Sequence, residues 1–313
     1  MPAPAQQPSQ VARIGYLSTG LGTPDLQVSL DGLRQGLGER GLIEGRNIRI
    51  EYRSAEGRLE QLPALAAELV RLKVDLIVAG ATPAALAAKQ ATSTIPIVAH
   101  AMGDPVGDGL VASLARPGAN VTGTTFLGPK LVPKHLELLK QTLPAILRVS
   151  VLRHPGAFAA STMTEMLKET EAAAATLRIR LHFSEVQSAD DLEPAFARIR
   201  AERADAVVVF PSPLLFFERK RIVALVTEHR LPAMFNNSQA VEIGGLIGYG
   251  ASLRDLGRQT ASYVDRILKG TRPMDLPVQQ PTKFELVVNL RSAKALGITV
   301  PKSILVRADR VIE

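Results

Sequence analysis

The sequence predicts an α/β protein built from two lobes, each with a parallel β-sheet. Its 313 residues are enough for two domains, at about 100–200 residues per domain. Short apolar runs alternate with amphipathic stretches along the whole chain. A linker-like segment near residue 125 interrupts this alternation. Together these observations favour two sheets over one long sheet.

The predicted strands are short apolar runs, several of them continuous and rich in β-branched residues. Such runs are typical of strands that are buried on both faces of a sheet. The predicted strands are residues 14–17, 48–52, 76–79, 97–99, 149–152, 180–183, 206–210, 246–249 and 284–289.

Helices are predicted between these strands, where apolar residues recur at helical spacing. In the first helix Leu26, Leu30, Leu33 and Leu37 share one face, and Gly41 provides a stop signal. The predicted helices are residues 26–40, 59–72, 163–177, 253–268 and 292–296. Alternating strands and helices with short loops indicate βαβ units, and therefore parallel sheets.

Three segments have the character of crossings between the lobes: residues 123–129, Gly244-Gly245 and residues 277–281. We therefore expect the first lobe to hold residues 11–125 plus 246–280. The second lobe would hold residues 126–245 plus 281–313.

The composition excludes several function classes. Lys and Arg total 37 against 30 Asp and Glu, but the basic residues are scattered, aromatic residues make up 4% and Trp is absent. A nucleic-acid binder usually carries a basic stripe, so we expect no nucleic-acid partner. The absence of Cys excludes disulfides and thiolate chemistry. The longest apolar runs are too short to span a bilayer.

The usual fingerprints of catalysis and cofactor binding are absent from the sequence. It contains no GxGxxG, GxxxxGK[ST], GxSxG or HExxH motif, and no two of its five histidines are four residues apart. We therefore expect no catalytic residue, no metal site and no cofactor.

Ligands of open α/β sheets bind beyond the carboxyl ends of the strands, so the loops there provide the candidates. In the first lobe they are Ser18, Thr19, Gly80, Thr82, Ala101, Met102, Asp104 and Thr125. Thr82, followed by Pro83, suits the start of a helix. The free N–H groups of that helix start would bind a carboxylate; alternatively, Thr82 only caps the helix. Asp104 suits a ligand amine, although a structural role in its loop is favoured.

The corresponding candidates of the second lobe are Phe158, Phe210, Ser212, Asn236 and Tyr249. The chain has nine phenylalanines, and three of them fall in or beside loops at strand ends: Phe158, Phe210 and Phe235. Aromatic walls with a few polar anchors are typical of small-ligand pockets. Phe210 and Phe235 could equally complete the core. Tyr249 would place a hydroxyl near the ligand.

Several long motifs resemble those of the ABC-transporter substrate-binding family related to the tryptophan-type binding proteins. The motifs are Arg13–Ser18, Thr94–Val98, Asp104–Val106 with Gly109–Val111, Ser113–Gly123, Gly244–Gly250 and Pro281–Asn289. The resemblance extends from about residue 12 to the end of the chain. It implies the type I periplasmic-binding-protein fold, in which two Rossmann-like lobes are joined by three hinge crossings.

The resemblance implies a solute-binding protein of an ABC importer that closes on a small ligand and is not an enzyme. The ligand would be an amino acid or an aromatic or branched carboxylate, and the partners would be the permease subunits. We expect a monomer in the periplasm. Residues 2–10 look like the start of a mature exported chain, with Met1 in place of a removed signal.

Two alternatives remain at this point. One is a ligand-sensing regulatory domain of the same fold, although such proteins usually carry a helix-turn-helix before a first strand that here begins at about residue 12. The other is an α/β enzyme, for which the sequence offers no nucleophile or cofactor motif.

Overall fold

The computed structural model describes residues 11–20 and 24–313, which form two compact units. The first unit comprises Met1–Thr125 and Leu253–Pro281, and the second comprises Phe126–Ser252 and Thr282–Glu313. Residues 2–10, expected to be the start of a mature exported chain, lie outside the described residues. Each unit is a sheet covered by helices on both faces, as the sequence predicts.

The first unit contains a five-stranded parallel sheet in the order β2-β1-β3-β4-β5. Its strands are β1 (Ala12–Ser18), β2 (Ile48–Ser54), β3 (Leu76–Gly80), β4 (Ile97–Met102) and β5 (Val121–Thr125). Its helices are α1 (Pro24–Gly38), α2 (Leu62–Arg71), α3 (Ala81–Ala91) and α10 (Leu253–Leu268), with short 3-10 turns at Leu59–Gln61 and Pro273–Asp275.

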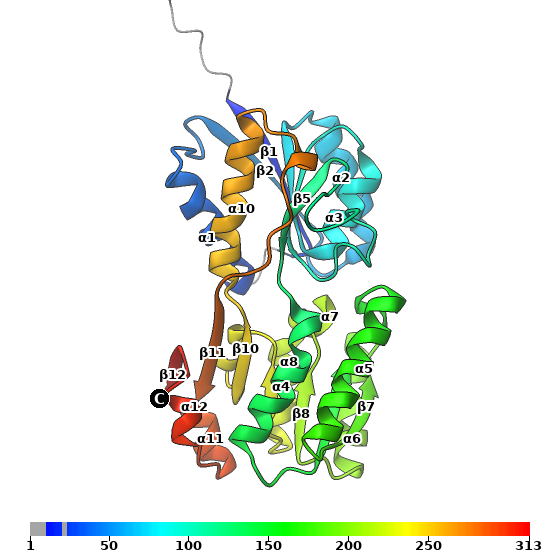
Figure 1. Ribbon diagram of the computed structural model, residues 1–313, viewed down its shortest axis with the longest axis vertical. Coiled ribbons are helices and arrows are strands. Elements are labelled where there is room, and N and C mark those ends of the chain that lie inside the picture. Colours follow the sequence, from blue (N-terminus) through cyan, green and yellow to red (C-terminus); the bar gives the residue numbers. More distant parts are fainter. Residues whose placement is uncertain (1–10, 21–23) are drawn as a thin grey trace, which may run out of the picture. The chain divides into compact units, whose positions relative to one another are not determined.

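Helices cover both faces of this sheet (Figure 1), and an apolar layer lies between the helices and the sheet on each face. Along β3, Leu76 and Val78 pack with α1 and α10, whereas Ile77 and Ala79 pack with α2 and α3. Alternate side chains of a strand point to opposite faces, so both faces need apolar residues and the strand reads as a continuous apolar run.

Helices α1 and α10 approach each other at glycines. A Cβ atom added to Gly257 would lie 2.2 Å from the carbonyl oxygen of Ser29, and one added to Gly32 would lie 2.1 Å from the carbonyl oxygen of Arg254. A Cβ atom added to Gly36 would lie 2.7 Å from the Cβ atom of Ala261. Only glycine at these positions lets the two backbones come so close.

The second unit contains a seven-stranded sheet in the order β12-β11-β10-β9-β8-β6-β7. Its strands are β6 (Arg148–Arg153), β7 (Arg180–Glu185), β8 (Ala206–Val209), β9 (Ala233–Phe235), β10 (Ile247–Ala251), β11 (Phe284–Asn289) and β12 (Arg310–Ile312). The expectation of a wholly parallel sheet is wrong here, because β11 runs antiparallel to β10. The chain reaches β11 from the first unit and therefore enters the sheet at the opposite end.

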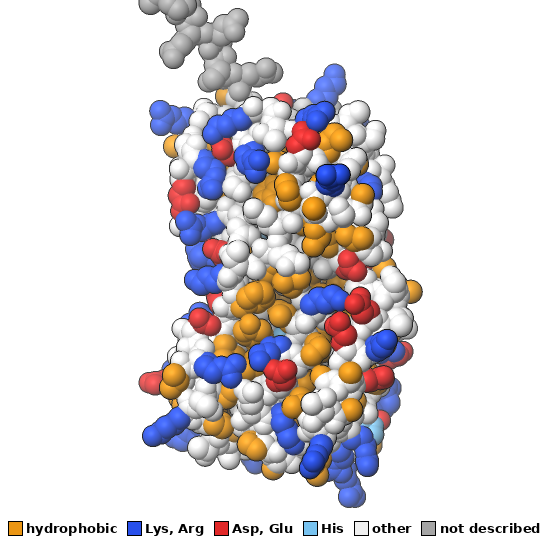
Figure 2. Space-filling view, viewed as in Figure 1, with side chains coloured by type: hydrophobic (Ala, Val, Ile, Leu, Met, Phe, Trp, Pro, Cys, Tyr) orange, Lys and Arg blue, Asp and Glu red, His pale blue; other side chains and the backbone are white. Residues whose placement is uncertain are grey.

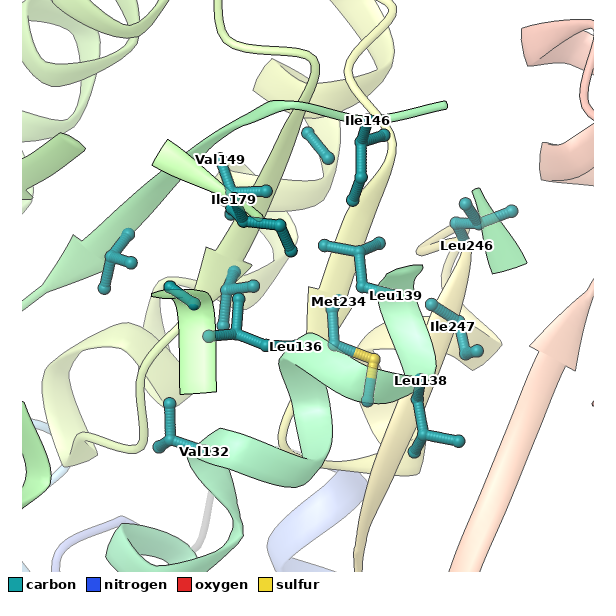
Figure 3. Close-up of a cluster of buried hydrophobic side chains, with 14 of the residues drawn as sticks. Val132, Leu136, Leu138, Leu139, Ile146, Val149, Ile179, Met234, Leu246 and Ile247 are labelled. Carbon is teal, nitrogen blue, oxygen red and sulfur yellow. The ribbon is translucent and has the colours of Figure 1, made fainter. Parts of the chain in front are cut away.

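Helices cover both faces of the second sheet as well. They are α4 (Gly128–Thr142), α5 (Ala160–Thr176), α6 (Leu192–Ala201), α7 (Pro213–Phe217), α8 (Arg219–Glu228), α9 (Ser238–Glu242), α11 (Leu290–Leu296) and α12 (Lys302–Leu305), with 3-10 turns at Pro155–Ala157 and Ala189–Asp191. Figure 3 shows the core beneath α4, where Leu136 and Leu139 pack near Val149 and Met234. Fully buried aliphatic side chains of this kind each contribute about 1.5–3 kcal/mol to folding.

The chain passes between the units at residues 125/126, 252/253 and 281/282. The predicted crossing at Gly244-Gly245 is therefore wrong, and so is the assignment of residues 246–252 to the first lobe. Strand β10 pairs with β9 and β11 and thus completes the second sheet. Both glycines lie just before β10, in the turn that follows α9.

The third crossing segment is hydrogen-bonded to both of the others. In the first unit, the Thr125 amide donates to the Gln279 carbonyl at 2.9 Å. In the second unit, the Ser252 amide donates to the Lys283 carbonyl at 3.1 Å. Backbone pairing therefore fixes the crossings to one another on each side.

Charged side chains are distributed over the surface without a single basic stripe on the face shown in Figure 2, where Lys and Arg are mixed with Asp and Glu. Of the helices in the described part of the chain, none has both the length and the apolar character needed to cross a membrane.

The close contact of α1 and α10 predicts that Gly257→Ala destabilises the protein. The added methyl group meets backbone atoms that cannot move independently, so overpacking should cost about 1–3 kcal/mol in the free energy of unfolding. Gly38→Ala is the matched control, because no atom lies within 4 Å of a Cβ atom there. Urea unfolding of both variants measures the difference, and equal stabilities would refute the proposed contact.

Candidate functional site

The carboxyl ends of four neighbouring strands bring the predicted residues of the first unit into one row. The register pairs Leu17 with Ala79 and Gly80 with His100, so Ser18 lies beside Gly80. Met102 pairs with Thr125 on β5. The structure therefore gathers Ser18, Gly80, Ala101, Met102 and Thr125 along one edge of the sheet, as predicted.

Two alanines at this edge have a left-handed backbone conformation. Ala81 has φ +67° and Ala101 has φ +55°, and each follows one member of the Gly80–His100 pair. Non-glycine residues in this conformation cost about 1–2 kcal/mol each. Four other residues with positive φ follow the ends of helices, where this conformation is usual; they are Lys73, Arg178, Arg203 and Arg230. Ala81 is instead the first residue of α3, and Ala101 lies in β4. Such strain elsewhere than after the end of a helix is typical of functional sites.

Thr82 does not cap α3, so that reading of the sequence is wrong. The N-cap residue is Gly80, and no side chain caps the helix. Thr82 lies within the first turn, and its Oγ1 accepts a hydrogen bond from the Gly103 amide at 3.1 Å. Thr82 thus ties the start of α3 to the loop after β4, and the first turn of α3 is free of a side-chain cap.

His100 is a buried bridge between β4, α1 and α10. Its Nε2 lies 2.5 Å from Ser29 Oγ, and its Nδ1 lies 2.9 Å from Thr260 Oγ1. Because the Thr260 hydroxyl donates to the Leu256 carbonyl, it accepts from Nδ1–H, which leaves Nε2 to accept from Ser29. Burial lowers the pKa of His100 to about 4, so the ring is neutral at pH 7.

The other polar candidates of this edge have distinct roles. Ser18 Oγ bonds both the amide and the carbonyl of Gly20, which shapes the loop that also contains Thr19. Asp104 Oδ1 accepts from the Gly107 amide at 2.9 Å, which is the structural role favoured by the sequence. The Met102 side chain is buried in the core, so only its backbone remains for a ligand.

Thr125 differs from the other threonines of β5. Thr122 Oγ1 donates to the Leu276 carbonyl at 2.6 Å, and Thr124 Oγ1 accepts from the Ala101 amide at 3.2 Å. Thr125 Oγ1 is also buried, but it has no hydrogen-bond partner among the described residues. An unpaired buried hydroxyl costs about 1–3 kcal/mol, which a ligand group could offset.

In the second unit the ends of β6, β8 and β9 also lie at one edge. Ser212 is the N-cap residue of α7, and its Oγ lies 3.2 Å from His154 Nδ1 beyond the end of β6. Burial lowers the pKa of His154. Asn236 Oδ1 accepts from the side chain of Asn237, which caps α9. These polar candidates therefore also position the loops.

The aromatic candidates belong mainly to the cores of the second unit. Phe210 is 1% exposed in the cluster beneath α4, and Phe235 is 1% exposed on the other face, which is the core role the sequence left open. Phe158 is half-buried against the first of these clusters. The ring of Tyr249 stacks on Phe284, with centroids 5.8 Å apart, and so lies against its own unit.

Sequence reasoning missed Gln239, a buried residue in the first turn of α9. Its side chain is 4% exposed, and Oε1 has no hydrogen-bond partner among the described residues. A polar residue two positions after the cap of a helix that follows a strand is the signal that could have identified it.

The arrangement offers binding groups and no set of metal ligands. Within residues 11–20 and 24–313, no group of three or more His, Asp or Glu residues could hold a metal ion. Backbone amides, hydroxyls and side-chain amides at strand ends are suited to hydrogen-bond a small polar ligand.

Comparison with known proteins gives concordant results. The family model for ABC transporter substrate binding proteins matches residues 18–312. A tyrosine-binding protein of Clostridioides difficile (strain R20291) is 27% identical over 276 residues, which cover 88% of this chain and 78% of the relative.

Two of the similar solved structures each cover 96% of this chain. A conserved domain protein from Vibrio cholerae is 32% identical, with a TM-score of 0.89 over 96% of this chain and 100% of the other. An ABC domain from Streptococcus pneumonia, solved in complex with L-Trp, is 28% identical, with a TM-score of 0.88 over 96% and 99%.

The neutral state of His100 predicts a loss of stability in acid. Its pKa is lower in the folded protein than in the unfolded chain, so the unfolded chain binds more protons as the pH falls from 6.5 to 4. Between pH 7 and pH 5 the protein should lose roughly 2 kcal/mol through this residue. His135, whose pKa burial also lowers to about 4, should add a similar loss.

Denaturant unfolding at several pH values measures this effect. His100→Gln should be less stable than the parent at pH 7, since the bridge is altered. Its stability should nevertheless fall less steeply between pH 7 and pH 5. An unchanged slope in this variant would show that His100 is not the group responsible.

Proposed function

Because the chain belongs to the family of ABC transporter substrate-binding proteins, we propose that it binds an aromatic amino acid and delivers it to an ABC importer. It would act outside the cytoplasm, in the periplasm, where a chain without cysteines needs no reducing environment. Its partners would be the amino acid and the permease subunits, and the protein would bind without catalysing a reaction.

The observation that carries this proposal is the row of strand ends in the first unit. The strained residues Ala81 and Ala101 directly follow the paired residues Gly80 and His100 there, and Ala81 begins the uncapped helix α3. Backbone N–H groups in such a place are suited to a carboxylate. We therefore assign the ligand carboxylate to the segment from Gly80 to Thr82.

The aromatic part of the ligand is proposed from the relatives. A protein 28% identical to this chain was solved with L-Trp bound, and a protein 27% identical is named for tyrosine. An apolar ring also suits an edge to which the half-buried Phe158 contributes an aromatic side chain.

Delivery to the importer requires that the permease distinguish the loaded from the empty protein. We propose that the three crossings act as hinges on which the units close around the ligand. A ligand that binds the closed form more tightly shifts the population towards it. The permease would then recognise the closed form.

Fluorescence titration with L-tryptophan tests this proposal directly. The chain contains no Trp, so selectively excited indole fluorescence reports the ligand alone. We expect saturable binding of L-tryptophan or L-tyrosine, the latter measured by competition. At about 100 times its Kd, the ligand should stabilise the protein by about 2.7 kcal/mol.

Tryptophan amide is the matched control, because it keeps the ring and the amino group but lacks the carboxylate. It should bind at least about tenfold more weakly if the carboxylate is held as proposed. If no aromatic amino acid binds or raises the melting temperature, the proposed ligand class is wrong.

A further inference from the structure

The side-chain oxygen of Gln239 makes no hydrogen bond to any described residue. Its neighbours in α9 and the preceding loop do make such bonds. Asn237 Oδ1 accepts from the Ala240 amide at 2.9 Å, and the Val241 carbonyl accepts from Asn289 Nδ2 at 3.0 Å. Gln239 is 4% exposed, as is Asn289, yet its Oε1 has no partner among the residues described.

A buried amide oxygen without a partner is unfavourable for the folded protein. Gln can donate two hydrogen bonds and accept two, and in water all of them are satisfied. An apolar side chain of similar length, such as Met, would fill the same space without losing these bonds on folding. The stability of the unliganded chain therefore gives no reason for Gln at this position.

The position of Gln239 relates it to the edge where ligands of this fold class bind. Strand β9 ends at Phe235, and only Asn236 and Asn237 separate it from α9. This loop lies directly on β10, since a Cβ atom added to Gly250 would lie 2.1 Å from the Asn236 carbonyl oxygen. Gln239 thus belongs to the carboxyl edge of the second sheet.

From these observations we infer that Gln239 is a specificity-determining residue, whose side-chain oxygen accepts a hydrogen bond from the α-ammonium group of the ligand. The inference rests on the proposed function and extends it, because it selects amino acids over the corresponding acids without an amino group. A neutral amide suits this task, because an amino acid with an uncharged side chain is a zwitterion and carries no net charge.

The buried oxygen also explains why such selection would be strong. A ligand without the ammonium group leaves the Gln239 oxygen buried and unpaired, whereas an amino acid satisfies it. Sites that hydrogen-bond a polar group of the ligand reject analogues that lack this group, because their own buried atoms then stay unpaired.

The test compares two ligands in two variants. L-tryptophan and indole-3-propionate differ in the amino group, and Gln239→Met removes the side-chain oxygen. The full chain should bind L-tryptophan more tightly than indole-3-propionate. Gln239→Met should lower the affinity for L-tryptophan about tenfold or more and change that for indole-3-propionate by less than about twofold.

Gln187→Met is the matched control, because Gln187 is an exposed residue of the same unit, and it should leave both affinities unchanged. The melting temperature of Gln239→Met should equal or exceed that of the parent. Gln239→Glu, which keeps the acceptor oxygen, should retain the preference for L-tryptophan and serves as the second test if the Met variant folds poorly.

Three results would overturn the inference. The first is an equal loss of affinity for both ligands in Gln239→Met, which would indicate a merely structural role. The second is an unchanged affinity for L-tryptophan in that variant, and the third is a lost preference for L-tryptophan in Gln239→Glu. If the parent protein binds neither ligand, the proposed function fails, and this outcome is distinct from all three.

Discussion

The close packing of α10 on α1 is the interaction on which the first unit depends. Helix α10 follows the second crossing, more than a hundred residues after the chain first leaves this unit, and it covers one face of the first sheet. Glycines bring the two helices together, and His100 then hydrogen-bonds Ser29 of α1 and Thr260 of α10. The end of β4 is thereby fixed, which supports the strained conformation of Ala101.

The two edges of each sheet differ in how their polar groups are satisfied. At the amino edge, side-chain carboxylates bond the strand amides: Asp75 accepts from Arg13 at 2.7 Å, and Asp205 accepts from Leu147 and Arg148 at 2.9 and 2.8 Å. At the carboxyl edge lie the strained alanines and the side-chain oxygens of Thr125 and Gln239, which have no hydrogen-bond partner in the described part of the chain. A ligand can gain most where groups are held in place but not yet bonded.

The alternation of strands and helices was sufficient to predict the α/β class and the row of Ser18, Gly80 and Ala101, because parallel strands end at one edge. It could not predict which sheet β10 joins, since a short strand carries no information about its partner. The alternation also could not decide whether Phe210 packs in the core or contacts a ligand. Left-handed Ala101 and buried Gln239 depend on contacts far along the chain, and local sequence does not reveal such contacts.

The central claim is that the ligand binds at the carboxyl edges of the sheets, and the backbone amide NMR shifts on addition of L-tryptophan test it most directly. The account predicts the largest shifts at residues 18–20, 80–82 and 101–103 in the first unit and at 236–240 in the second. Amides at the amino edge, such as Arg13, Leu147 and Arg148, should shift little. Large shifts confined to the amino edge or to helix surfaces would contradict the account.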